Sequence, residues 1–80
     1  MNQEMALRVD PLMDEMLDLF VEEGNLTTGA LVDMTGKSRA TVTKRLDKLR
    51  TAEAIEYVHE STGLHRLVED PREDSDAQQD

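Results

Sequence analysis

The chain has 80 residues, a formal net charge of −9 and no cysteine, which predicts a single domain with a modest core and excludes disulfide cross-links and thiolate metal sites. No apolar run approaches the roughly 20 residues that a membrane helix needs, and residues 1–5 lack the basic-then-apolar order of a secretion signal, so we expect a cytoplasmic protein. The acidic composition, with 2% aromatic residues, is typical of proteins from salt-loving archaea, although an ordinary acidic protein would show it as well.

The first expected helix begins at Pro11, because Asp10 can cap its free amides and proline suits the first helical position. Apolar residues then recur at helical spacing as far as Phe20. Gly24 is suited to end this helix with a left-handed cap. Residues 1–9 form an N-terminal extension in this interpretation.

The segment after Gly24 predicts a second, shorter helix. Leu26 and Thr27 form either a very short strand or the entry to this helix, which Thr27 or Thr28 would cap. The helix has an apolar side made by Leu31, Val32 and Met34. Gly36 breaks the helix, because glycine adopts a positive φ angle without strain.

A third helix is expected over about residues 39–52, with Ser38 as its N-cap. Val42, Leu46 and Leu49 recur at i, i+4 and i+7 and predict one buried stripe. The outward-facing residues of this helix are predicted to be Arg39, Ala40, Thr43, Lys44, Asp47 and Lys48.

The hydrophobic period then changes to that of strands. Residues 55–60 and 64–69 favour two strands, separated by the turn residues Ser61, Thr62 and Gly63. Asp70 and Pro71 end the second strand, and residues 71–80 predict a disordered acidic tail.

Three helices followed by a β-hairpin predict an α+β, mainly α fold with the layout of a winged helix-turn-helix domain over residues 10–70. In that layout the third helix enters the major groove of DNA and the hairpin forms the wing.

Most of the positive charge lies in one short stretch. Residues 37–50 hold six bases and one acid, whereas residues 1–36 hold one base and eight acids, and residues 51–80 hold two bases and nine acids. Such clustering in an acidic chain favours a basic helix face that binds phosphates, although basic helix faces are often only solvated surface.

The predicted DNA contacts follow from this placement. Arg39, Thr43 and Lys44 would face base edges, because arginine pairs bidentately with guanine and threonine can contact a thymine methyl. Lys44 and Lys48 also suit phosphates, which position a protein without specifying a sequence. The full set of candidate DNA-binding residues is Lys37, Ser38, Arg39, Ala40, Thr41, Thr43, Lys44, Lys48, Thr62, Gly63, His65 and Arg66.

The run from Leu31 to Leu49, LVDMTGKSRATVTKRLDKL, resembles the winged helix-turn-helix cores of MarR-like and related prokaryotic regulators. The wing through Arg72 is similar to that of short haloarchaeal and archaeal-virus winged-helix repressors. The resemblance covers residues 10–72 and implies a repressor that binds a specific sequence of double-stranded DNA, often as a homodimer on an inverted repeat. Lys37 and Ala54 depart from it, because the family has an apolar residue and a glycine there.

Other functions have less support in the sequence. The main alternative is a winged-helix module for protein–protein interaction in a transcription or replication complex, which the acidic surface would suit. A switch that senses a small-molecule effector has no support, because the first expected helix has no polar cluster that would bind the effector. His59, Glu60 and His65 lack a further firm ligand for a metal. With no nucleophile motif or phosphate loop, we expect neither enzyme activity nor a cofactor.

Overall fold

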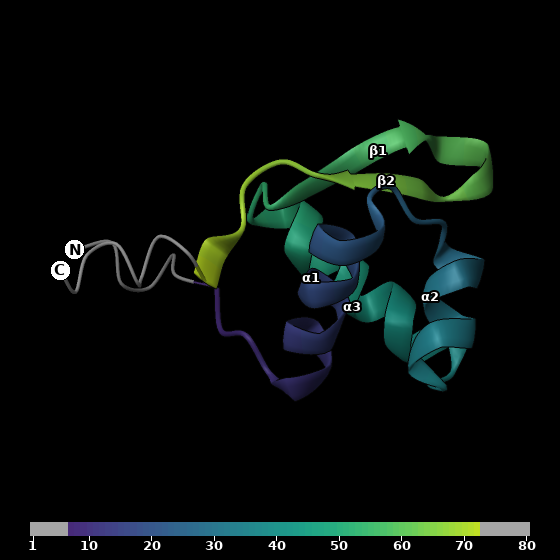
Figure 1. Ribbon diagram of the computed structural model, residues 1–80, viewed down its shortest axis with the longest axis horizontal. Coiled ribbons are helices and arrows are strands. Elements are labelled where there is room, and N and C mark those ends of the chain that lie inside the picture. The colour runs from purple at the N-terminus through teal and green to yellow at the C-terminus, as the bar shows by residue number, and fades with distance from the viewer. Residues whose placement is uncertain (1–6, 73–80) are drawn as a thin grey trace, which may run out of the picture.

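The computed structural model describes residues 7–72, so the remainder of the expected extension and acidic tail, 1–6 and 73–80, lies outside the described residues. The elements are α1 (Pro11–Glu23), α2 (Thr28–Thr35), α3 (Arg39–Thr51), β1 (Ile55–His59), a 3₁₀ turn η2 (Glu60–Thr62) and β2 (Leu64–Leu67). Three helices followed by an antiparallel hairpin confirm the predicted winged helix-turn-helix layout, and Figure 1 shows the hairpin lying along one side of the helices.

Each helix begins at a side-chain cap of the kind that the sequence predicts. Asp10 accepts a hydrogen bond from the Met13 amide at 2.8 Å, directly before Pro11. Thr27 caps α2 and Ser38 caps α3 in the same way, each by accepting from the amide three residues ahead. These caps satisfy amides that have no partner inside the helix, so the helix starts are fixed by local chemistry.

The helix ends differ from the predictions in detail. Gly36 adopts the left-handed conformation, with φ 73°, whereas Gly24 has φ 92° and ψ −140° and so is not the left-handed cap that we expected. At the end of α3 the positive φ angle, 64°, falls on Glu53. The Ala54 amide there donates to the Leu49 carbonyl at 2.9 Å, the bond of a Schellman motif that usually contains glycine.

One hydrophobic core joins the helices to the hairpin. The predicted stripe of α3 is buried, as is one apolar side of α1, and partly buried Leu7 and Val9 pack against the same core. The core residues are Leu12, Met13, Met16, Leu17, Phe20, Leu26, Leu31, Val42, Leu46, Leu49, Ala54 and Ile55.

The hairpin is fastened to the helices through its second strand. Residues of β1 and β2 pair in antiparallel register, with Ile55 opposite Leu67 and Tyr57 opposite His65. Leu26 forms an isolated bridge with His65, with backbone hydrogen bonds of 3.0 and 2.8 Å. Leu26 thus forms a single β-bridge and no strand, and Thr27 is the helix cap, so the interpretation of this segment as the entry to α2 is the correct one.

The chain after β2 returns to α1. Asp70 is buried and accepts bonds from the Arg72 guanidinium, which also contacts the Asp14 and Asp18 carboxylates at 2.8 Å. Hydrogen bonds from Arg72 hold the pKa of Asp70 below its usual value, and the three carboxylates raise the pKa of Arg72. Arg72, which the sequence placed in the tail, is thus part of the folded unit. No helix within residues 7–72 is long and apolar enough to span a membrane.

Candidate nucleic-acid interface

The outer face of α3 carries the predicted DNA contacts. Val42, Leu46 and Leu49 are fully buried, which fixes the rotation of the helix. Because residues four apart lie on one face of a helix, the opposite side is a ridge made by Ala40, Lys44 and Lys48. The predicted outward residues Arg39, Ala40, Thr43, Lys44, Asp47 and Lys48 are all exposed.

The six bases of residues 37–50 divide into two groups. Arg45 donates to Asp10 at 2.9 Å, and Arg50 pairs with Asp47, so the charges of these two arginines are balanced within the protein. None of the ion pairs among residues 7–72 involves the other four bases of this stretch. These four, which we call the basic face, are Lys37, Arg39, Lys44 and Lys48.

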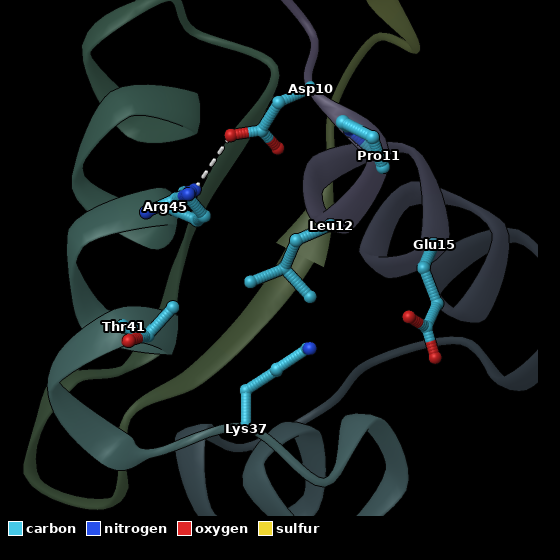
Figure 2. A pocket seen from close by; sticks show the side chains of 7 residues that line it. All are labelled: Asp10, Pro11, Leu12, Glu15, Lys37, Thr41 and Arg45. Atoms are coloured by element: carbon cyan, nitrogen blue, oxygen red, sulfur yellow. Dashed lines mark hydrogen bonds and ion pairs between the residues drawn. The ribbon is translucent and has the colours of Figure 1, made fainter.

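On the side of α3 that faces α1, an ion pair balances the charge of Arg45, so this arginine is not part of the basic face. In Figure 2, Arg45 reaches across an open groove to Asp10, while Lys37 extends from the turn between α2 and α3 toward Leu12. Asp10 therefore serves two elements at once, since it caps α1 and binds α3. The hydrogen bond from the Met13 backbone amide lowers the pKa of Asp10, as do Arg45 and the nearby charge of Lys48. Asp10 therefore stays ionised.

The N-terminal end of α3 and the turn of the hairpin meet at the first turn of α2. The Arg39 Nη2 atom lies 3.8 Å from the position that a Cβ on Gly29 would occupy. The Gly63 carbonyl accepts from the Thr28 amide at 3.1 Å, and Gly63 packs directly against the Thr28 side chain. The predicted base-contacting arginine and the wing are thereby brought to one side of the domain.

The wing offers less positive charge than its sequence implies. Arg66 pairs with Glu56 on the neighbouring strand at 2.7 Å, and both side chains are half exposed. Thr62 is exposed, and its hydroxyl donates to the His59 carbonyl. Thr62 and His59 are thus among the exposed polar residues of the wing tip, which also include Glu60 and Ser61, whereas Gly63 packs against α2.

His65 is a correction to the predicted interface. Its side chain is 1% exposed, so it cannot contact DNA in this conformation. Its Nδ1 atom lies 2.7 Å from the Gly63 carbonyl, its Nε2 atom lies 2.8 Å from Nη1 of Arg50, and its ring stacks on Tyr57 with centroids 4.6 Å apart. The alternation of exposed and buried residues along a strand was the one signal for this burial, and the polar neighbours of His65 obscured it.

The geometry around the two histidines does not support the alternative of a metal site. Both ring nitrogens of His65 are already hydrogen-bonded, and the His59 ring lies against the Thr62 hydroxyl at 3.0 Å. No three histidine, aspartate or glutamate side chains gather as metal ligands in the part of the chain that the structure describes.

Comparison of the chain with protein-family models, curated proteins and solved structures gives no match. The resemblance of residues 31–49 to MarR-like regulators therefore stays a prediction. A functional assignment depends on the geometry of this chain alone.

Proposed function

We propose that this protein is a transcriptional regulator, acting as a repressor, that binds double-stranded DNA sequence-specifically through α3 and the wing. The observation that carries the proposal is the basic face: Arg39, Lys44 and Lys48 are exposed on the second helix of a helix-turn-helix, Lys37 lies in the turn before it, and none of the four forms an ion pair within residues 7–72. The domain around it is strongly acidic, so this one surface attracts phosphate while the remainder repels it.

We expect the residues of the basic face to make two kinds of DNA contact, to base edges and to phosphates. The major groove is about 12 Å wide and admits one α-helix. Arg39 stands at the N-terminal end of α3, where side chains of a recognition helix approach base edges. Thr43 and Lys44 lie one turn further on, and Lys48 lies a second turn on, where the helix passes the phosphate backbone.

The wing is the second part of the proposed interface. With Arg66 balanced by Glu56, we expect the wing to contact the DNA backbone through the Thr62 hydroxyl, main-chain groups and the exposed His59 ring. Contacts of this kind position the protein without adding sequence information.

The proposal is tested by fluorescence anisotropy titration of duplexes taken from around the gene of the protein. Arg39→Ala should weaken binding to the specific site by about 1–3 kcal/mol and relax the sequence preference, whereas Lys48→Ala should weaken binding to all duplexes alike. Equal losses for both variants on every duplex would refute this division of roles. Failure of the folded wild-type protein to bind any duplex would refute DNA binding itself.

A second function, docking to another protein of a transcription or replication complex, is favoured by exposed apolar side chains on the hairpin. Val58 and Val68 are 47% and 48% exposed, and the surface around them is acidic. This function does not need the basic face, so a partner that still binds a Lys44→Ala/Lys48→Ala variant would support it over the first.

The resemblance also leads us to propose a homodimer on an inverted repeat, and the acidic composition leads us to propose an origin in a salt-rich cytoplasm. Two subunits on half-sites about one helical turn apart would give a stoichiometry of two chains per duplex. Sedimentation of the complex in high potassium chloride measures that stoichiometry and also shows whether the fold is retained there.

A further inference from the structure

His65 lies where the wing, α3 and the N-terminal side of α2 meet. Its backbone bridges Leu26, directly before the cap of α2. Its Nδ1 atom contacts the Gly63 carbonyl at the wing turn, and its Nε2 atom contacts Arg50 on α3. The same Gly63 carbonyl accepts from the Thr28 amide of α2. One imidazole therefore links the turn of the wing to the helix that carries the basic face.

The partners of His65 determine its protonation state. A carbonyl oxygen can only accept a hydrogen bond, so Nδ1 must carry a hydrogen and donate to Gly63. A guanidinium can only donate, so Nε2 must present its lone pair to Arg50. The structure therefore requires the neutral ring with its hydrogen on Nδ1. A second proton, on Nε2, would face a donor that is already charged.

The groups around the ring also disfavour a charge there. Burial has the largest effect and lowers the pKa of His65; the hydrogen bond to Gly63 raises the pKa by less, the positive charge of Arg50 lowers it, and Asp47 raises it by the least, so the pKa is lowered overall. Arg50 lies over the Tyr57 ring, 4.4 Å from its centroid, and pairs with Asp47. The groups that face His65 are thus Arg50 and, behind it, Asp47 from α3, Tyr57 from β1, and the neutral backbone at Gly63.

We propose that His65 is a positioning residue for DNA binding, which holds the wing against α3 only while its ring is neutral, so that acidification releases the wing and weakens the complex. Protonation removes the acceptor for Arg50 and places two positive groups in contact inside the protein. The link from α3 to the wing turn then opens, and the wing loses its fixed angle to the basic face. This inference rests on the proposed DNA-binding function.

The expected pH dependence has a defined sign and size. If the complex requires neutral His65, binding is coupled to the loss of one proton, and the Kd rises with falling pH toward a limit of about tenfold per pH unit. The chain has two histidines, and His59 is exposed at the wing tip. A charge on His59 would attract phosphate, so its protonation should act in the opposite direction.

The state of His65 can be measured without DNA. Nitrogen-15 NMR of the full chain should show one histidine as the neutral Nδ1–H tautomer, with a pKa below the ordinary value of about 6.5. As this ring titrates, the amide signals of Thr28 and Gly63 should shift with it. An Nε2–H tautomer, an ordinary pKa, or amides that do not follow the titration would overturn the inference.

DNA anisotropy over about pH 5 to 8, the range in which histidine changes charge, then tests the effect on binding. His65→Gln keeps an acceptor for Arg50 but cannot be protonated there, so it should bind as tightly as wild type at high pH and lose the weakening in acid. His59→Gln is the matched control and should keep or deepen the weakening. Arg50→Gln, which removes the contact of α3 with His65, should weaken the complex already at high pH and flatten the acid dependence, and it serves if His65→Gln does not fold.

The outcomes separate the two proposals. If the wild type binds DNA with the same pH profile as His65→Gln, the positioning role is wrong while the proposed function stands. If the wild type binds no DNA at any pH, the proposed function is wrong, and the NMR titration still decides whether the wing responds to His65.

Discussion

The pairing of Arg45 with Asp10 leads to a specific prediction about the salt dependence of DNA binding. Lys44 and Arg45 are neighbours on α3, but Lys44 makes no ion pair among the described residues, whereas Arg45 donates to Asp10 at 2.9 Å. Lys44→Gln and Arg45→Gln each remove one positive charge. We expect only the first to change the number of counterions that DNA releases on binding.

The size of the effect follows from the number of bases in this stretch that form no ion pair within residues 7–72. The slope of log K against log salt is about −0.9 for each phosphate neutralised, so the basic face gives a limit of about −3.6 when each of its four residues neutralises one phosphate, whereas all six bases of the stretch would give about −5.4. Lys44→Gln should bring the slope to about −2.7. Arg45→Gln should leave it near the wild-type value, because Asp10 already balances that charge.

Anisotropy titrations of one duplex at several potassium chloride concentrations measure these slopes. Circular dichroism at each salt concentration checks that both variants are folded, since Arg45→Gln also removes a tie between α1 and α3. A wild-type slope near the six-base value, or equal losses of slope in the two variants, would refute the assignment of Arg45 as internally balanced.

Further predictions concern stability and are measured by thermal unfolding. Glu53→Gly should stabilise the fold by about 1 kcal/mol, because a side chain at φ 64° is strained and glycine is not; an unchanged Tm would contradict this. Gly36→Ala and Gly63→Ala both place a side chain at positive φ, but only the Cβ at Gly63 meets another residue, 3.2 Å from the Thr28 Cβ, so it should destabilise by about 1–3 kcal/mol more. Arg72→Gln should lower the Tm at neutral pH and lose its effect in strong acid. Arg72 lowers the folded pKa of Asp70, so the stability that this pair contributes is complete above the ordinary carboxyl pKa and is lost as the pH falls through the lowered one. An equal Tm difference at both pH values would exclude this coupling.

The features that the sequence predicted well depend on short-range interactions. Asp10, Ser38 and the Val42, Leu46, Leu49 stripe act within one or two turns of their own helix, so capping and periodicity located the starts of α1 and α3 and the buried side of α3. The positive φ angle at Gly36 was predicted for the same reason. Where the sequence lacked the usual glycine, at Glu53, the conformation of the helix end was not foreseen.

By itself, then, the sequence determined the order of the helices and the hairpin, the outward face of α3 and the presence of a basic cluster in an acidic chain. Only the tertiary structure decided that the charge of Arg45 is balanced by Asp10, across 35 positions, and that His65 is buried against Arg50, across 15. It likewise decided that Arg72 belongs to the folded unit, through a contact with Asp14 across 58 positions. Charge pairing and burial are set by the packing of elements distant in the chain, and local patterns of residue type carry no record of those distances.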